Sequence, residues 1–463
     1  MRRFFFITIL LVFATQGLQA QKTTISGTAP GAEGKKIILV KFSDLITFEE
    51  IILDSAIVDS TGKFTLDHDL AEPVYVSVSI DFHKVEMFLE PGREYGLIIA
   101  PQDYNNYKEI NPLLQSQNLQ AEIKADLDDL NIQVNEFNAK YDQFILSNFE
   151  ALYRERNKAK LDSFRVKVSK QFESSTSPYF TQYVRYKLAS IEQLTQALTQ
   201  AQLAKKYFIG QPVLYENLEY MDFFNSFFAK YMTVTSRILH KVDYLPLLKG
   251  PEAYDKIMKT MNQDTLLKDV QVRELVMLKG MMELFNTTGY PQEEVIQVIR
   301  TAQSKLKFAE NRTIAIDMEK HLMNLKPGTM APVFTLTDLQ KKKVSLKSLR
   351  GKPVLLSFWT TYCPTCLTQL DIMKTLYEKY KDRFYFVSIS ADRDFIRMRY
   401  FLEQKKDYSW IFLHLGDQFH LLKDYDVRSF PLFVLIDMEG VIYKYPADFP
   451  ESGLEASMEK MFE

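Results

Sequence analysis

The sequence predicts a multidomain protein with an N-terminal β-sandwich, a helical middle region and a C-terminal α/β domain. Residues 22–111 hold short apolar or alternating runs separated by turn signals. Residues 112–325 place apolar side chains at helical spacing and contain few Gly or Pro. Over 326–463, strand-like apolar runs alternate with amphipathic helical segments, as in βαβ units. A chain of 463 residues is long enough for about three such domains.

The first 20 residues have the pattern of a secretory signal peptide. Arg2 and Arg3 precede an apolar run from Phe4 to Phe13, and Ala20 is a small residue at a plausible cleavage point. The run is too short to cross a bilayer, which needs about 20 apolar residues. We therefore expect cleavage near Gln21 and export to the periplasm or cell envelope, with an uncleaved N-terminal anchor as the alternative. No later stretch is apolar enough to cross a membrane.

The N-terminal region is expected to form strands without a catalytic site. The runs "KKIILV", "EEIILDSAIV", "PVYVSVSI" and "MFLEPGREYGLIIA" are separated by turn signals such as "DSTGKF". His68 and His83 lack the spacing of metal ligands, so both are expected to be ordinary surface or core residues. The formal charge of −2 gives no indication of nucleic acid or of an anionic membrane surface as a partner.

The middle region is expected to be helical, beginning with "NLQAEIKADLDDLNIQVNEFNAKYDQFIL". Its methionines, such as Met277, Met281 and Met282, could line a ligand groove. Met and aromatic residues at helical spacing are more often core residues, which is the interpretation we favour. A linker, "LKPGTMAP", ends the region at 325–332.

The chemistry is expected in the C-terminal domain, because "WTTYCPTC" contains both cysteines of the chain. The preceding "PVLLSFW" is typical of a strand buried on both faces, and a helix is expected from Cys363 to about Lys381. The first turn of a helix favours an anion, which lowers the pKa of a thiol there. Cys366 lies one turn later, within reach of Cys363 for a disulfide. The two residues can therefore exchange two electrons with another thiol–disulfide pair.

The motif "FWTTYCPTC", followed by "YDVRSFPLFVLIDMEGVI", resembles the thioredoxin superfamily, and most of all its exported TlpA/ResA branch of thiol–disulfide oxidoreductases. The resemblance implies a thioredoxin-like fold, with "FTLTDLQKKKVSL" as an added β-hairpin. It also implies a cis Phe430–Pro431 bond, with Pro431 against the disulfide. In the N-terminal region, "KFTL" and "FLEPG" resemble a domain of unknown function that often precedes such modules in Gram-negative envelope proteins.

The resemblance assigns roles to individual residues. Cys363 would attack or be attacked, Cys366 would resolve, and a substrate-binding surface would be formed by Trp359, Tyr362, Phe430 and Pro431. Two positions depart from the family: Ser357 stands where thioredoxin has a buried Asp, and Gln369 where the branch often has Glu. Either acid could take the proton from Cys366, so water or substrate would have to do so here.

The cysteine pair also has four other interpretations. A zinc site needs four ligands, and only His414 and His420 stand near. A structural disulfide would close too small a loop to stabilise much. A peroxiredoxin-like thiol peroxidase fits Thr360, but such enzymes usually have proline at the position where Leu356 stands. A non-catalytic binding protein could use the module as a scaffold, although the intact motif and Pro431 argue against it.

The sequence therefore predicts an exported oxidoreductase that uses no cofactor and no metal. Its expected partners are envelope proteins with reducible disulfides and a membrane thiol electron donor. We expect a reductase, because the sequence places no cation beside Cys363: Lys374 lies two to three turns along the helix, and only Arg428 could approach by folding.

Overall fold

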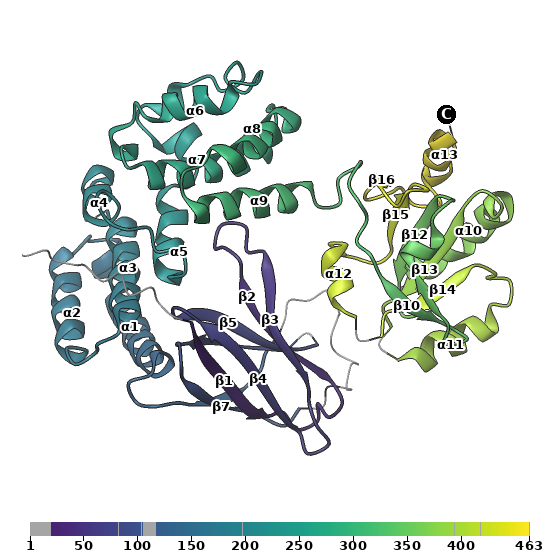
Figure 1. The fold of residues 1–463 in the computed structure, drawn as a ribbon, viewed down its shortest axis with the longest axis horizontal. Coiled ribbons are helices and arrows are strands. Elements are labelled where there is room, and N and C mark those ends of the chain that lie inside the picture. The colour runs from purple at the N-terminus through teal and green to yellow at the C-terminus, as the bar shows by residue number, and fades with distance from the viewer. Residues whose placement is uncertain are drawn as a thin grey trace, which may run out of the picture.

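A computed structural model describes residues 20–462, apart from 82, 103, 105–116, 197, 393 and 417. The predicted signal peptide, except for Ala20, lies outside the described residues. A β-rich part, a helical part and an α/β part follow one another along the chain (Figure 1). The order confirms the predicted fold class. No helix in the described ranges is both long and apolar enough to span a bilayer.

The N-terminal part is a sandwich of two sheets around an apolar core. One sheet has the order β4-β1-β7-β9 and the other β3-β2-β5-β6-β8. Pairing is antiparallel except for β1 with β7 and β6 with β8. The strands are β1 (Gln21–Thr28), β2 (Lys36–Phe42), β3 (Glu50–Ile57), β4 (Lys63–Leu70), β5 (Val74–Ile80), β6 (His83–Leu89), β7 (Glu94–Ile99), β8 (Gln117–Asn118) and β9 (Ala121–Lys124).

The last two strands lie in the range that we expected to be helical. Strand β9 pairs with β7. The first helix begins only at Leu130, where the Asp129 side chain accepts a hydrogen bond from the Asn131 N–H as an N-cap. The prediction of helix from residue 118 was therefore wrong for residues 118–124. A short segment such as "AEIK" can form a helix or a strand, and here pairing with a neighbouring strand decides between them.

The helical part runs from 130 to 323 and has its own core. Met277 and Met281 are fully buried there, and Met282 packs against the same cluster, which supports core positions rather than a groove. The helices are α1 (Leu130–Tyr153), α2 (Lys158–Gln171), α3 (Pro178–Leu194), α4 (Gln200–Tyr207), α5 (Leu218–Phe227), α6 (Ala253–Met261), α7 (Val270–Phe285), α8 (Gln292–Lys305) and α9 (Ala309–Met323).

The loop between β2 and β3 joins the sandwich to the helices. Leu45 and Ile46 of this loop are buried in the helical core, not in the sandwich. Asn225 of α5 donates a hydrogen bond to the Leu45 carbonyl (2.9 Å), and Ser43 donates one to Asp317 of α9 (2.6 Å). The hairpin therefore projects out of the sandwich toward α5 and α9, and its loop is hydrogen-bonded to both helices (Figure 1).

The C-terminal part is a seven-stranded sheet in the order β11-β10-β14-β13-β12-β15-β16. Central strand β12 is buried along its whole length, as its continuous apolar run predicts. The strands are β10 (Thr335–Asp338), β11 (Lys343–Ser345), β12 (Val354–Trp359), β13 (Tyr385–Ser390), β14 (Ile411–His414), β15 (Leu432–Ile436) and β16 (Ile442–Lys444), and the helices are α10 (Pro364–Tyr380), α11 (Phe395–Gln404), α12 (His420–Asp424) and α13 (Leu454–Glu459).

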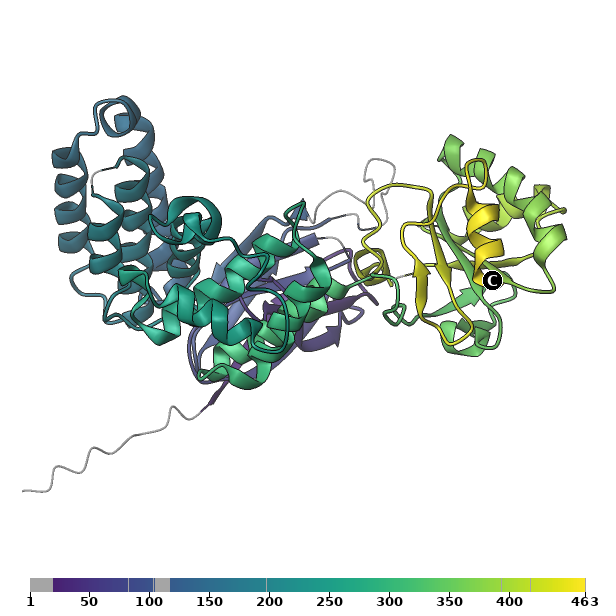
Figure 2. The ribbon, with the colours of Figure 1, turned by 90° about the horizontal axis from the view of Figure 1, so that it is seen from above.

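The two faces of this sheet have separate cores. Leu355 and Trp359 of β12 pack with α10, α11 and α13 on one face, and Leu356 and Phe358 pack with α12 on the other. Figure 2 shows the C-terminal part at one end of an elongated molecule and helices α1–α4 at the other. On its side facing the sandwich, Lys423 of α12 forms an ion pair with Glu50 of β3 (2.7 Å).

Candidate active site

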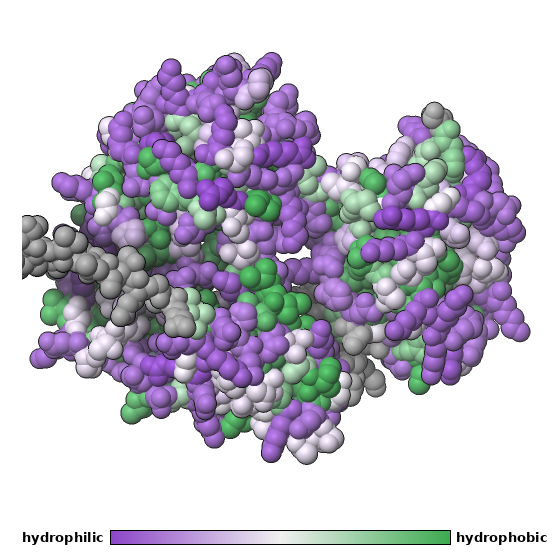
Figure 3. All heavy atoms as spheres, in the orientation of Figure 1, coloured by the Kyte–Doolittle hydropathy of each residue, from purple (hydrophilic) through white to green (hydrophobic). Residues whose placement is uncertain are grey.

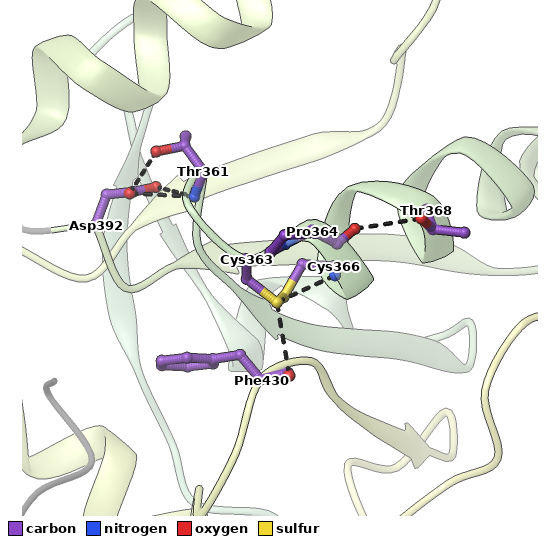
Figure 4. Close-up of a disulfide and its surroundings, with 7 residues drawn as sticks. All are labelled: Thr361, Cys363, Pro364, Cys366, Thr368, Asp392 and Phe430. Atoms are coloured by element: carbon purple, nitrogen blue, oxygen red, sulfur yellow. Dashed lines mark hydrogen bonds between the residues drawn. A yellow bond between two sulfur atoms is a disulfide. The ribbon is translucent and has the colours of Figure 1, made fainter.

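Strand β12 and helix α10 together position the two cysteines. Cys363 is the N-cap of α10, and Pro364 occupies the first turn, where a proline costs no hydrogen bond. The cysteines form a disulfide with a Cα–Cα distance of 5.2 Å. Cys363 Sγ accepts a hydrogen bond from the Cys366 N–H at 3.1 Å (Figure 4). This donor and the helix N-terminus are suited to stabilise a thiolate at Cys363 once the disulfide is reduced.

The two sulfurs differ in access. Cys363 is partly exposed, whereas Cys366 is fully buried in the apolar cluster that contains Trp359 and Leu370. A thiol or disulfide of another protein can therefore reach Cys363 first. A buried thiol in apolar surroundings is the less reactive one of such a pair.

The loop before β15 lies against the disulfide. The Phe430–Pro431 peptide bond is cis, as the resemblance implied. The Phe430 carbonyl oxygen is 3.6 Å from Cys363 Sγ, so a reduced thiol there could donate a weak hydrogen bond to it (Figure 4). Pro431 is buried and Phe430 is half-buried, so the loop forms one wall beside the accessible sulfur.

Asp392 holds the segment that leads from β12 into the motif. Its carboxylate accepts hydrogen bonds from the Thr361 backbone N–H (3.0 and 3.1 Å), the Thr361 hydroxyl (2.7 Å) and the Ser390 hydroxyl (2.7 Å). The side chain is 2% exposed, and Figure 4 shows it across Thr361 from the disulfide. Sequence reasoning missed this residue. Its position directly after β13, which pairs in parallel with β12, was the available signal.

The structure separates the four residues predicted to contact substrate. Tyr362 is 55% exposed and precedes Cys363 in the chain, and the Phe430 carbonyl contacts Cys363 Sγ just before Pro431. Trp359 is fully buried and packs against Phe401 and Phe412, so it cannot touch a substrate in this conformation. The prediction of a surface role for Trp359 is therefore corrected to one beneath the site, because it points into the α10 face of the sheet.

Neutral side chains occupy both positions at which the family has an acid. Ser357 shares a hydrogen bond with Ser388 (2.8 Å), and Trp410 Nε1 donates to the same Ser388 hydroxyl (2.9 Å). Gln369 is buried and accepts a hydrogen bond from the Glu451 backbone N–H (3.4 Å). At both positions a neutral side chain therefore makes hydrogen bonds to neutral groups, and no carboxylate is present at either position.

The cations considered from the sequence are paired elsewhere. Arg428 bonds to Asp426 through Nε (2.9 Å) and Nη2 (2.8 Å), and Lys374 pairs with Asp407.

Among the described residues no group of three or more His, Cys, Asp or Glu side chains could hold a metal ion. His414 Nδ1 accepts a hydrogen bond from the Gly416 N–H, and burial lowers the His414 pKa. The arrangement fits thiol–disulfide exchange better than metal binding.

Comparison with known proteins follows the same division of the chain. The Redoxin family model matches residues 326–460, and the model of a domain of unknown function, DUF4369, matches residues 23–126. The thiol-disulfide oxidoreductase ResA of Bacillus cereus (strain ZK / E33L) is 33% identical over 136 residues, which are 29% of this chain and 78% of that protein. The thioredoxin-like protein YneN of Bacillus subtilis (strain 168) is 33% identical over 126 residues, 27% of this chain and 72% of that protein.

Two solved structures match about a third of the chain. The thioredoxin domain of a thiol-disulfide oxidoreductase from Bacteroides vulgatus is 28% identical and covers 30% of this chain and 99% of that one, with a TM-score of 0.28. A thiol:disulfide interchange protein from Bacteroides sp. is 30% identical over 30% of this chain and 91% of that one, also with a TM-score of 0.28.

Proposed function

Because the C-terminal part of this chain belongs to the ResA-like thiol–disulfide oxidoreductases of the thioredoxin superfamily, we propose that the protein reduces disulfides in other proteins through Cys363 and Cys366. The observation that carries this proposal is the asymmetry of the pair: one sulfur is accessible at a helix N-terminus and the other is buried behind it. Residues 326–463 are proposed to form this redox domain.

The exchange has two steps. The Cys363 thiolate attacks one sulfur of the substrate disulfide, and the other substrate sulfur leaves as a thiolate that takes up a proton. Cys366 then loses its proton and attacks Cys363 Sγ, which releases the second substrate sulfur. Two electrons and two protons pass to the substrate, and the enzyme is left as the disulfide. A thiol donor must reduce it again.

The surroundings of Cys363 support the reducing direction. A strong oxidant needs a highly stabilised thiolate in its reduced form. Here the stabilising groups are the helix N-terminus and the Cys366 N–H, while Arg428 and Lys374 are paired with carboxylates. The buried Asp392 carboxylate near the motif opposes a second negative charge. We also propose that water or substrate accepts the proton of Cys366, because Ser357 and Gln369 are neutral.

The proposed setting is the periplasm or cell envelope. The N-terminal 20 residues support export, and the partners would be envelope proteins with reducible disulfides and a membrane thiol donor. Tyr362, Phe430 and Pro431 would form the surface that contacts the substrate. Leu356, by contrast, lies in mid-strand between Val387 and Val434, so the proline typical of the peroxidase alternative is missing there.

Two cysteine variants test the exchange mechanism. Cys366→Ser should accumulate mixed disulfides with oxidised substrate proteins, and Cys363→Ser should accumulate none. Faster alkylation of Cys366 than of Cys363 in the reduced protein at neutral pH would contradict the assignment.

Equilibration of the purified protein with glutathione buffers tests the direction. We expect a reduction potential well below the value of about −120 mV that is typical of a dedicated oxidase. A potential near that value would overturn the reductase assignment and leave only the exchange chemistry.

A further inference from the structure

An open cavity lies between helices α2, α3 and α4, at the end of the molecule away from the redox domain (Figure 2). Its volume is about 670 Å³, within the range of roughly 300–1,000 Å³ that is usual for small-molecule sites. Helices α2 and α3 both line it with the spacing i, i+3 and i+7, so one side of each helix forms a wall. These residues are Arg165, Val168 and Phe172 on α2, and Thr181, Val184 and Leu188 on α3.

The walls of this cavity are mainly apolar. Val168, Leu188 and Tyr207, the last residue of α4, are buried. The ring of Phe172 meets that of Phe180 edge to face, with a centroid distance of 4.9 Å. On the face that Figure 3 shows, hydrophilic side chains cover most of the helical part. An apolar recess in such a surface is stabilised when an apolar group covers it, so the recess indicates a ligand with an apolar body.

Three cations also line the cavity, and two of them are compensated within the protein. Arg165 Nη2 (2.6 Å) and Lys206 Nζ (2.9 Å) bond to the carboxylate of Glu192, which is 1% exposed. Arg165 Nη1 lies 3.4 Å from a second carboxylate, that of Asp162. The positive charges of Arg165 and Lys206 are therefore used to hold the three helices together.

The third cation, Arg185 of α3, has no carboxylate partner among the described residues. Its Nη1 donates to Gln211 Oε1 (3.2 Å) and its Nη2 to the Lys206 carbonyl (2.9 Å), which are both neutral acceptors. The guanidinium lies 5.4 Å from the ring centroid of Tyr186 and 5.6 Å from that of Tyr207. A guanidinium carries five N–H donors in a planar fork, so three of them remain for a ligand.

The charges at the cavity suit an anion with a single negative charge. Arg185 supplies one positive charge, whereas Glu173 also lines the cavity and repels a doubly charged phosphate ester more strongly than a carboxylate. We propose that the cavity binds a small amphipathic carboxylate, with its carboxylate on Arg185 and its apolar body between α2 and α3. This site is separate from the disulfide, and the inference does not rest on the redox function.

Titration calorimetry of the full-length protein with decanoate tests the inference. We expect one decanoate to bind per chain, and Arg185→Gln to raise its Kd about tenfold, because a charge-assisted hydrogen bond becomes a neutral one. Arg237→Gln is the matched control, since Arg237 is an exposed arginine of the helical part that does not line the cavity. Its Kd should equal that of the unmodified protein.

A second variant leaves every charge in place. Val184→Trp puts an indole into the cavity, so it should also raise the Kd about tenfold or more. Thermal melting without decanoate shows whether each variant is folded. If Arg185→Gln is unfolded, the Kd of folded Val184→Trp decides.

Three results would overturn the inference: no binding by the unmodified protein at up to about 1 mM decanoate, an unchanged Kd in both folded cavity variants, or an equal rise in Arg237→Gln. Tighter binding of decyl phosphate than of decanoate would overturn the assignment to a carboxylate. Reduction of a disulfide reporter should be the same in all these variants, so a failure of that assay in the unmodified protein bears on the proposed function alone.

Discussion

Replacing Asp392 by Asn should make the Cys363 thiol more acidic. The Asp392 carboxylate is buried, and the hydrogen bonds described for it come from neutral groups of Thr361 and Ser390. Burial lowers the pKa of the nearby His414 and so disfavours its imidazolium form, which leaves the carboxylate charge to act on its surroundings. A nearby negative charge disfavours a thiolate and raises the thiol pKa, so its removal should lower that pKa. Asn keeps the shape and can still accept a hydrogen bond from the Thr361 N–H.

The size of the effect follows from the geometry. The Thr361 N–H lies 3.0 Å from the carboxylate and Cys363 is two residues further on, which places Sγ roughly 10 Å from the charge. At an effective dielectric constant near 20, two unit charges at that separation repel by about 1.7 kcal/mol. This corresponds to a fall of about one pKa unit in Asp392→Asn. Because a more stable thiolate favours the dithiol, the reduction potential should become less negative.

The assay is the rate of iodoacetamide alkylation of the reduced protein as a function of pH, with Cys366 replaced by Ser so that one thiol reacts. Asp371→Asn is the control, because Asp371 lies on the exposed side of α10 and is paired with Lys405 and Tyr408. The pKa of the Cys363 thiol in Asp371→Asn should match its pKa in the protein with Asp371 intact. A Cys363 pKa that is unchanged or raised in Asp392→Asn would refute the electrostatic reasoning and leave Asp392 as a purely structural anchor.

Two further predictions concern stability. A fragment of residues 324–463 should fold and reduce a model disulfide, because its two core clusters use residues from Leu325 onward; an unfolded fragment by circular dichroism would contradict the domain assignment. Glu192 is buried, which raises its pKa, but hydrogen bonds from Lys206, Arg165 and Tyr207 outweigh this and the net pKa is lowered from 4.5. Its stabilising contribution should therefore be present above pH 4.5 and be lost as the pH falls through the folded pKa of Glu192. The Glu192→Gln variant should lose roughly 2–4 kcal/mol of unfolding free energy in urea at pH 7. Its stability should also depend less on acid pH than that of the unmodified protein. Equal urea midpoints for the two proteins at pH 7 would rule this out.

Sequence reasoning predicted the C-terminal domain well because its signals are local. The apolar run of "PVLLSFW" predicted strand β12, and the helix expected from Cys363 to about Lys381 is observed at Pro364–Tyr380, with Cys363 as its N-cap rather than in its first turn. Strands β1 ("QKTTISGT") and β4 ("KFTLDHDL") were not singled out, since they hold few apolar residues. They are strands because they pair with each other over their full length, which is a long-range interaction.

The same distinction applies to the active site. The reactive pair and the cis proline are adjacent to strong sequence motifs, whereas Asp392 reaches the motif from a neighbouring strand. The burial of individual side chains near the motif could not be predicted from the sequence either. Trp359 and Tyr362 are three residues apart, yet one is fully buried and the other more than half exposed, because Trp359 ends the buried strand β12 whereas Tyr362 lies in the turn that follows it.

The loop between β2 and β3 carries Leu45 and Ile46 into the helical core. The segment that the family model matches is therefore not the segment that folds as a unit. The DUF4369 match ends at residue 126, as if the sandwich could be moved between proteins by itself. Cutting the chain there would leave two core side chains of the helical part on the other fragment and expose the apolar residues of that core. A gene fusion or an expression experiment should therefore keep residues 21–323 together, so that the helical core is complete.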